Sequence, residues 1–364
     1  MMLYWAYISL TFVAFQFINA LLNFVFPQKI KETPPLNNVL ISLLIPARNE
    51  EKNIKSLLDN LLKLPTQNIE IIVYDDQSTD DTAKIAESIS HKNPNIKLLK
   101  AVNKADGWLG KAHACHHLAK HAKGQYLIFI DADVRLYGAI IEEAVAYAAR
   151  YRLGLLSIFP IQIQKTLGER VAVPVMHYIL LTLLPLIFVR RSPFRAHSAA
   201  NGQFMCFNAG LYHKIQPHKL FKNSLAEDIA IASYLKKHKH KVACITGEEK
   251  VKCRMYHGYK EALYGFTKNI FMFFGNKPWL SFLFWGFAAL GIVPMLFLSN
   301  IFLAWYVAIV ISTLTLVSLS SRQNVLCNIF LFPLRLFFLL QLMIKAVIIN
   351  KRKNYLWKGR SVYA

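Results

Sequence analysis

Long uncharged runs lie at the two ends of the chain, and the acidic residues lie in the middle. Residues 1–28 contain no charged side chain, and neither do the 44 residues of 278–321. A helix of about 20 apolar residues spans a hydrocarbon core of about 30 Å. We therefore expect one transmembrane helix in the first run. The second run predicts two, over 279–298 and 301–320, with a tight turn near Ser299.

The N-terminal run is predicted to be a retained membrane anchor. A cleavable signal peptide has a basic start and a small-residue cleavage site. Here the start is uncharged, the run is long and aromatic, and Lys29 and Lys31 follow it. Because basic residues favour the cytoplasmic side, we expect the N-terminus outside and Lys29 inside.

A third apolar stretch near the C-terminus leaves two alternatives open. Residues 325–349 carry Arg335 and Lys345 and are divided by Pro333. A true span would place the basic tail from Lys351 onward outside, against the positive-inside preference. The stretch is therefore either an interfacial or re-entrant helix pair, or a third span.

Between Val39 and Pro160, short apolar runs alternate with helical patterns. Strands are predicted at 39–45, 69–74, 96–100, 125–130 and 153–159, and helices at 53–64, after Ser78, at 112–122 and at 138–151. Continuous apolar runs are typical of strands buried on both faces. This alternation predicts an α/β fold with an open, mostly parallel sheet covered by helices on both faces.

The composition supports a membrane protein. The chain is 54% hydrophobic and 18% charged, with 43 Lys and Arg against 21 Asp and Glu, and every acid lies between Glu32 and Glu261. Apolar ends with basic fringes suit anionic lipid headgroups. Nucleic-acid binding would explain the basicity but not the uncharged runs, so we expect no nucleic-acid partner. The five Cys residues show no metal-type spacing and are expected to be reduced thiols.

Three polar clusters follow predicted strands, at 46–51, 75–81 and 131–133. In open α/β sheets, ligands bind at the carboxyl ends of the strands. No Gly-x-Gly-x-x-Gly follows the first strand, and the sequence Gly-Trp-Leu-Gly-Lys-Ala at 107–112 lacks the remaining features of a phosphate loop. Asp131 and Asp133 are hard oxygen ligands that suit Mg²⁺ or Mn²⁺ bridging a diphosphate.

The order of these motifs resembles the family-2 inverting glycosyltransferases with a GT-A fold. The resemblance covers about residues 39–245 and rests on LLIPARNEEKNI, IIVYDDQSTDDT, GWLGKAHA, LIFIDADV, NGQFMCFN and LAEDIAIA. The anchor and the C-terminal hydrophobic hairpin are similar to the membrane-bound branch that glycosylates lipids. Arg254-Met-Tyr256, Gly265-Phe-Thr-Lys268-Asn269 and Trp357-Lys-Gly-Arg360 are similar to the carotenoid glycosyltransferases, with ceramide glucosyltransferases more distant.

The resemblance implies roles for individual residues. It implies a uridine pocket lined by Pro46, Arg48 and Glu50, with Asp76 on the uracil ring, Asp75 beside it, and Lys111 near the diphosphate or the uracil. It also implies Mg²⁺ or Mn²⁺ at Asp131 and Asp133, with Asp133 the direct ligand, and Asp228 of the Glu227–Asp228 pair as catalytic base. In-line displacement at an anomeric carbon needs such a base and a cation for the leaving diphosphate.

The Gln-x-x-Arg-Trp motif of processive synthases and ceramide enzymes is absent. The segment Gly265–Asn269 occupies the comparable place, so Lys268 is expected to supply the missing cation to the diphosphate. The absent motif and the few spans also weigh against a polysaccharide synthase.

These expectations divide the chain into four parts. They are a transmembrane anchor (1–28), a nucleotide-sugar-binding half (29–165), an acceptor half (166–277) and C-terminal membrane helices with a basic tail (278–364). The uncharged run 171–189 is predicted to be an interfacial helix, because a span there would separate Asp133 from Asp228. The catalytic domain is thus expected on the cytoplasmic side of a multi-pass cell-membrane protein.

The first function hypothesis is transfer of one sugar from a UDP-sugar to a lipid hydroxyl or carboxyl. The alternatives are a polyprenyl-phosphate or polysaccharide transferase, and a catalytically silent nucleotide-sugar-binding scaffold. Some polar residues have simpler interpretations. Asp80 and Asp81 fit the start of a helix, Glu227 fits a helix cap, and the basic run 236–241 fits a helix end that is solvated or faces lipid headgroups.

Overall fold

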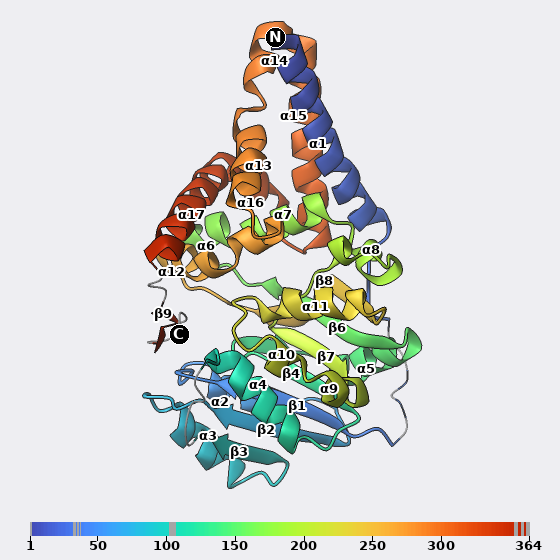
Figure 1. The fold of residues 1–364 in the computed structure, drawn as a ribbon, viewed down its shortest axis with the longest axis vertical. Helices are drawn as coiled ribbons and strands as arrows, with labels where there is room; N and C mark the ends of the chain where they lie inside the picture. Colours follow the sequence, from blue (N-terminus) through green and yellow to red (C-terminus); the bar gives the residue numbers. More distant parts are fainter. Residues whose placement is uncertain are drawn as a thin grey trace. The chain divides into compact units, whose positions relative to one another are not determined.

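The computed structural model describes residues 2–31, 34, 36, 38–101, 107–352, 356–357 and 360–361 (Figure 1). Two compact units divide the chain. The helical unit comprises residues 1–28, 162–188 and 255–355, and the sheet unit comprises residues 29–161, 189–254 and 356–364. Lys353 and Lys358 of the predicted basic tail lie outside the described residues.

An eight-stranded mixed sheet forms the centre of the sheet unit. Its spatial order is β3 (Ile96–Lys100), β2 (Ile69–Asp75), β1 (Ile41–Ala47), β4 (Tyr126–Ile130), β7 (Phe204–Asn208), β6 (Leu153–Gln162), β8 (Lys241–Cys253) and β5 (Val134–Leu136). Leu43, Leu44 and Ile45 of β1 are fully buried. The apolar runs therefore form strands because both of their faces are covered.

The sheet is parallel in one half and contains antiparallel pairs in the other. β1 pairs in parallel with β2 and with β4, and β2 pairs in parallel with β3. β7 is antiparallel to β4 and to β6, and β5 is antiparallel to β8. The α/β class predicted from the sequence is confirmed. The parallel arrangement stops at β7, because this later strand enters between β4 and β6.

Helices of the sheet unit are α2 (Ile54–Leu62), α3 (Thr82–Ser90), α4 (Gly110–His121), α5 (Ile140–Arg150), α9 (Ala209–Ile215), α10 (Pro217–Leu220) and α11 (Glu227–Lys237). α4 packs on β1 and β2, and α5 packs on β7. A short antiparallel pair, β9 (Leu356–Trp357) with β10 (Arg360–Ser361), is separate from the main sheet.

The predicted cap at Ser78 is wrong, because α3 begins only at Thr82. Asp80 Oδ1 accepts a hydrogen bond from the Thr82 N–H at 3.0 Å and so serves the helix start. Ser78 Oγ instead accepts from the Asn49 N–H at 3.0 Å. That bond ties the loop after β2 to the loop after β1.

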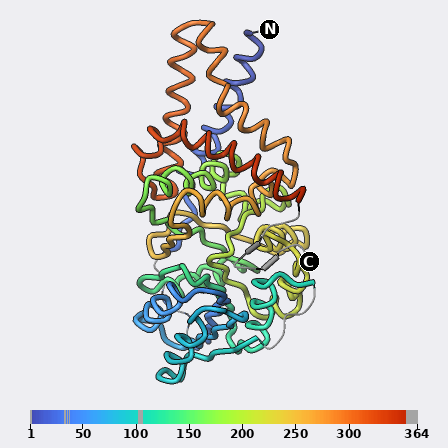
Figure 2. Tube along the Cα trace, turned by 90° about the vertical axis from the view of Figure 1, so that its left-hand side faces the viewer, coloured from blue at the N-terminus to red at the C-terminus, as the bar shows by residue number. Residues whose placement is uncertain are grey.

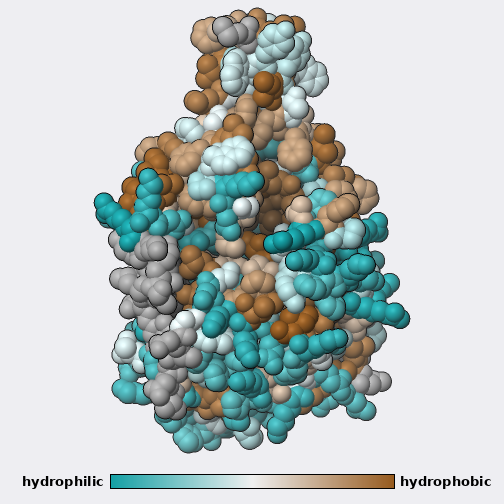
Figure 3. Space-filling view, viewed as in Figure 1, coloured by the Kyte–Doolittle hydropathy of each residue, from teal (hydrophilic) through white to brown (hydrophobic). Residues whose placement is uncertain are grey.

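In the described part of the helical unit, four helices are apolar and long enough to cross a membrane, namely Met2–Val25, Pro278–Leu298, Asn300–Ser320 and Phe332–Arg352. They correspond to α1 (Met2–Val25), α13 (Pro278–Leu290) with α14 (Val293–Leu298), α15 (Asn300–Ser320) and α17 (Phe332–Arg352). α1 runs beside α15 (Figure 2). Many apolar side chains of these helices are exposed (Figure 3), as expected for surfaces in contact with lipid.

The single helix predicted over 171–189 is wrong. The run contains the end of α6 (Leu167–Ala172), α7 (Pro174–Leu183) and the start of α8 (Leu186–Arg191). Pro174 stands at the start of α7, and Pro185 follows its end. Proline lacks the N–H needed to continue a helix, so the run is broken. Residues 174–182 of α7 are buried, and the helix packs on α1 and α15.

Residues 325–349 form a helix pair, α16 (Val325–Phe330) and α17, with Pro333 in the first turn of α17. Arg335 on α17 is 2% exposed. Its guanidinium donates to the Arg170 and Asn328 carbonyls at 3.2 Å and to the Asn328 side-chain oxygen at 2.9 Å. Backbone and amide oxygens thus solvate this charge inside the unit, which is how such residues are accommodated among apolar helices.

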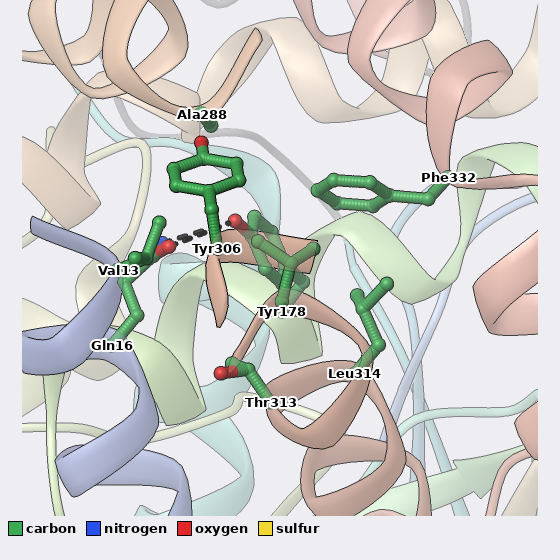
Figure 4. Close-up of a pocket in the computed structure, with 9 residues that line it drawn as sticks. Val13, Gln16, Tyr178, Ala288, Tyr306, Thr313, Leu314 and Phe332 are labelled. Carbon is green, nitrogen blue, oxygen red and sulfur yellow. Dashed lines mark hydrogen bonds between the residues drawn. The ribbon is translucent and has the colours of Figure 1, made fainter. Parts of the chain in front are cut away.

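The remaining elements of the helical unit are α12 (Tyr259–Gly265) and the 3-10 turns η2 (Phe266–Lys268) and η3 (Ile270–Phe274). A small pocket lies among α1, α7, α13, α15 and α17 (Figure 4). Its walls are largely apolar, and the Gln16 amide and the Tyr178 hydroxyl are hydrogen-bonded there at 3.0 Å.

Candidate active site

The loops that follow β1 and β2 are fastened to each other. The Asp76 N–H donates to the Ala47 carbonyl at 2.8 Å. Arg48 is 8% exposed, and its Nη1 donates to the carbonyls of Asp76 at 2.6 Å and Gln77 at 2.9 Å. Asn49 and Gln77 both have positive φ values, of 50° and 55°. The predicted uridine-binding residues therefore lie in one rigid double loop.

Two adjacent carboxylates are buried in this double loop. Asp75, at the end of β2, is 5% exposed and Asp76 is 2% exposed. The Ser78 N–H donates to Asp75 Oδ2 at 3.3 Å. Burial and the charges of Asp76 and Asp75 raise the pKa of the neighbouring Tyr74. Pro46 and Glu50 complete the predicted set, with Pro46 in β1 and Glu50 hydrogen-bonded to Asn53 at 2.8 Å.

Lys111 and Asp131 form the central ion pair of the site. Lys111 stands in the first turn of α4, and Asp131 follows β4. The Lys111 Nζ lies 2.6 Å from Asp131 Oδ1 and 4.0 Å from Glu227 Oε1, and donates to the Gly202 carbonyl at 3.2 Å. Burial by itself would lower the pKa of Lys111, but the charges of Asp131 and Glu227 raise it. Lys111 is thus a permanent cation beside Asp131.

Asp133 lies in a different environment from Asp131. Gln203 Nε2 donates to its Oδ2 at 3.3 Å and to Cys253 Sγ at 2.9 Å. Its Oδ1 is buried and has no hydrogen-bond partner among the described residues. Burial and the charge of Asp131 raise the pKa of Asp133 to about 6. A buried carboxylate with an unused oxygen is a favourable ligand for a cation.

These residues fit a metal ion that takes most of its ligands from the substrate. Among the described residues, no group of three or more His, Cys, Asp and Glu side chains could hold a metal ion by itself. Asp131 is already paired with Lys111, which leaves Asp133 as the available protein ligand. Mg²⁺ commonly binds through one or two carboxylates together with phosphate oxygens and water. The donor set therefore suits a metal–diphosphate complex.

Asp228 is held at the start of α11 by backbone donors. Its Oδ2 accepts from the Gly202 N–H and its Oδ1 accepts from the Ile229 N–H, both at 2.8 Å. α11 begins at Glu227, and its N-cap residue is Ala226. The interpretation of Glu227 as the cap is therefore wrong. Glu227 lies near Lys111 instead.

The backbone of Gly202 links Lys111 on one side of the site to Asp228 on the other. Its carbonyl accepts from Lys111, and its N–H donates to Asp228. A Cβ atom at position 202 would lie 3.0 Å from the Lys111 Nζ and 3.6 Å from Asp228 Oδ2. A side chain here would therefore crowd the Lys111 ammonium, which would have to move by a few tenths of an ångström.

The structure brings together all but one of the predicted site residues in the sheet unit. Lys268 is the exception, because it ends η2 in the helical unit. The histidines of α4 form an aromatic cluster, in which the His113 and His117 rings lie 4.4 Å apart and His117 stacks on Tyr74.

No role was predicted from the sequence for Gly202 or Gln203, although Asn-Gly-Gln at 201–203 begins one of the motifs that carry the family resemblance. A signal was present, because these polar residues directly precede the apolar run Phe204–Phe207. β7 is antiparallel to β4. The start of β7 therefore lies at the same sheet edge as the end of β4, where Asp131 stands.

Comparison with known proteins supports the interpretation of these residues as a glycosyltransferase site. Residues 42–215 match the family described as glycosyl transferase family 2. The chain is 32% identical over 233 residues to a 4,4'-diaponeurosporenoate glycosyltransferase of Staphylococcus haemolyticus, covering 63% of this chain and 60% of that protein. It is 30% identical over 244 residues to the Staphylococcus aureus (strain MRSA252) protein of the same name, covering 66% and 63%. The match thus spans about 60% of these relatives.

A solved structure shares the fold. The mannosyltransferase PcManGT from Pyrobaculum calidifontis, in complex with GDP-Man and Mn²⁺, superimposes with a TM-score of 0.56 at 15% identity, covering 94% of this chain and 99% of that one. The resemblance drawn from the sequence is confirmed, and residues 42–215 form a family-2 glycosyltransferase domain.

Proposed function

We propose that this chain, which contains a family-2 glycosyltransferase domain at residues 42–215, transfers one sugar from a UDP-sugar to a membrane lipid with inversion at the anomeric carbon. The observation that carries the proposal is the meeting of Asp131, Asp133 and Asp228 around Lys111 and Gly202. Displacement needs a site for the leaving group, and a hydroxyl acceptor also needs a base; these residues are suited to both tasks.

The double loop after β1 and β2 is assigned to the uridine. Arg48 fastens the loop through the carbonyls of Asp76 and Gln77, so the buried carboxylates of Asp75 and Asp76 are fixed before the donor binds. A fixed carboxylate can accept a hydrogen bond from the N–H of a uracil ring. Binding to a preformed loop costs less ordering entropy than binding to a mobile one.

Asp133, with Asp131 beside it, would hold Mg²⁺ or Mn²⁺, which when bound supplies positive charge to the diphosphate. The chain also has its own cation here. The Lys111 ammonium lies 2.6 Å from Asp131 and is held by the Gly202 carbonyl. We assign Lys111 to the diphosphate, where a permanent positive charge stabilises the leaving group. Lys268 remains a proposed second cation from the helical unit.

Asp228 is assigned as the base for a hydroxyl acceptor. A hydroxyl must lose its proton as the new bond forms, and a carboxylate within reach can take that proton. The two backbone N–H donors fix the position of the Asp228 carboxylate.

A lipid acceptor is supported by four helices apolar enough to cross a membrane and by the relatives. Those relatives are named as glycosyltransferases of 4,4'-diaponeurosporenoate, a carboxylate. A carboxylate acceptor is already ionised at neutral pH and needs no base, unlike a hydroxyl. The acceptor class can therefore be identified by the dependence of transfer on Asp228. We place the sheet unit on the cytoplasmic side, where UDP-sugars are available.

The test is mass spectrometry of lipid extracts from cells that express the wild-type chain, Asp133→Ala or no chain. The wild type should add lipids heavier by one hexose, and Asp133→Ala should add none while inserting equally into membranes. New lipids with both proteins would overturn the site assignment. No new lipid with wild type, together with a new polymer, would overturn single-sugar transfer.

A further inference from the structure

The last residues of α8 and the segment that follows them project a basic and aromatic surface from the sheet unit. We define the basic arm as residues 189–197, which include Arg191, Phe194 and Arg195. Phe194 is 67% exposed, and both arginines are exposed. Arg190 lies over the Tyr151 ring with 4.2 Å between its guanidinium carbon and the ring centroid. An exposed aromatic ring between cations is a combination found at membrane interfaces.

The basic arm is fixed to the second half of α11. Lys236 is 5% exposed, and its Nζ donates to the carbonyls of Val189 at 3.0 Å and His197 at 2.7 Å, one at each end of the arm. Arg195 Nε donates to Ser233 Oγ at 2.7 Å. The arm is therefore a built part of the unit and holds its exposed side chains in place.

The sequence of the arm and of the second half of α11 is strongly basic and contains no acid. Exposed Lys237 and Lys239 follow Lys236 at the end of α11, where hydrophilic side chains project in Figure 3. No acidic residue stands between Glu169 and Glu227, or between Asp228 and Glu248. The arm thus places the exposed positive charges of Arg191 and Arg195 near one exposed aromatic ring.

We propose that the basic arm, with the end of α11, binds the headgroups of anionic phospholipids, with Phe194 inserted among them. Chain continuity favours this partner, because residue 188 ends a segment of the helical unit and residue 189 begins the arm. Nucleic acid would satisfy the charge but gives no role to an inserted Phe194. The inference rests on the proposed membrane location of the helical unit.

This contact bears on catalysis through α11. Asp228 lies in the first turn of the helix that Lys236 and Ser233 fasten to the arm. α11 has 11 residues and is about 16 Å long. Headgroups that bind the arm therefore also set the depth at which Asp228 meets a lipid acceptor. Anionic lipid is thus a positioning partner of the base.

The test places a nitroxide label at single positions in the full chain reconstituted into nanodiscs. Four native cysteines are buried and Cys327 is partly exposed, so Cys327→Ser is the background. Phe194→Cys reports on the arm, Leu62→Cys is a control 42% exposed in the sheet unit, and Ile311→Cys, also 42% exposed, reports on α15. Collisions with oxygen and with a water-soluble nickel complex measure lipid and water contact.

With phosphatidylglycerol present, the label at 194 should gain oxygen contact and lose nickel contact, whereas the label at 62 should stay in water. Replacing Arg191 and Arg195 with Gln should shift the arm towards water by about five-fold per charge. A label at 194 that is as nickel-accessible as the label at 62, with the label at 311 in lipid, overturns the arm proposal alone. Protection of position 194 by added RNA, without a lipid effect, also overturns it. A water-exposed label at 311 overturns the membrane location itself.

Discussion

Replacing Asp228 with Asn tests the base directly, because Asn has nearly the same shape but cannot take a proton. The wild-type carboxylate accepts from two backbone N–H groups, those of Gly202 and Ile229. Asn offers one acceptor oxygen, so its amide NH₂ must face one of these donors. The substitution therefore removes a base and also leaves one N–H poorly paired.

The two effects differ in size. A buried donor left unsatisfied costs about 1–3 kcal/mol, and this cost falls on folding and on the local structure. Loss of general-base catalysis costs a factor of about 10²–10⁴ in rate. For a hydroxyl acceptor we expect Asp228→Asn to lower kcat by that factor while UDP affinity stays within a few-fold. For a carboxylate acceptor, only the structural effect should remain.

The assay is the single-turnover transfer rate in nanodiscs, with UDP affinity and the thermal midpoint measured on the same preparations. Glu227→Gln is the matched control, since Glu227 precedes Asp228 on α11 but lies 4.0 Å from Lys111. It should cost less than Asp228→Asn. Near-normal transfer to a hydroxyl acceptor by Asp228→Asn, or a product that retains the donor configuration, would refute the assignment. Loss of UDP binding in parallel with transfer would make Asp228 a structural residue.

Three further predictions concern the neighbours of the base and the arm. Lys111→Met removes the cation that neutralises Asp131, so the chain should bind Mn²⁺ more tightly in the absence of donor, as measured by electron paramagnetic resonance, while the transfer rate falls. An unchanged Mn²⁺ affinity would contradict a competition between the Lys111 ammonium and the metal ion. Gly202→Ala places a Cβ 3.0 Å from the Lys111 Nζ, so kcat should fall by about ten-fold or more. Gly210→Ala is the control and should leave kcat unchanged, because its Cβ would lie 3.4 Å from the nearest atom. Burial lowers the pKa of Lys236 in the folded chain to about 8, so between about pH 8 and 10 the unfolded chain binds more protons than the folded chain. The thermal midpoint should therefore rise with pH over that range, and Lys236→Met should lack this rise.

The sequence was most informative where one physical rule dominates. β1 and β4 are short apolar runs buried on both faces, and each is followed by polar residues, as predicted for strands that end at a ligand-binding edge. The uncharged stretches at 1–28 and 278–321 are long enough for membrane helices, and the structure has such helices there. Length and burial alone determine these elements.

Sequence patterns failed where tertiary neighbours determine the outcome. The order of the antiparallel strands follows from β7 entering beside β4, which no local pattern records. Run 171–189 is broken at Pro174 and Pro185, although its hydropathy is that of one helix. The role of Gly202 depends on Lys111 and Asp228, which lie 91 and 26 residues away in the chain.

The identities of the charged site residues could be anticipated, but their pairing could not. As two carboxylates after one strand, Asp131 and Asp133 look alike, and only the resemblance to the family pointed to Asp133 as the direct metal ligand. In the structure, Lys111 neutralises Asp131, whereas Asp133 is buried with an unused oxygen. This asymmetry arises because α4 brings Lys111 to the end of β4, and it supports Asp133 as the proposed metal ligand.

The central claim is tested most directly by the reaction of the purified chain in nanodiscs with UDP-sugars and a bacterial lipid extract. UDP release and lipid glycoside are measured in the same sample. The account predicts one UDP released for each single-sugar lipid formed, with loss of both in Asp133→Ala. UDP release with only free sugar as product, or growth of a polymer, would contradict it.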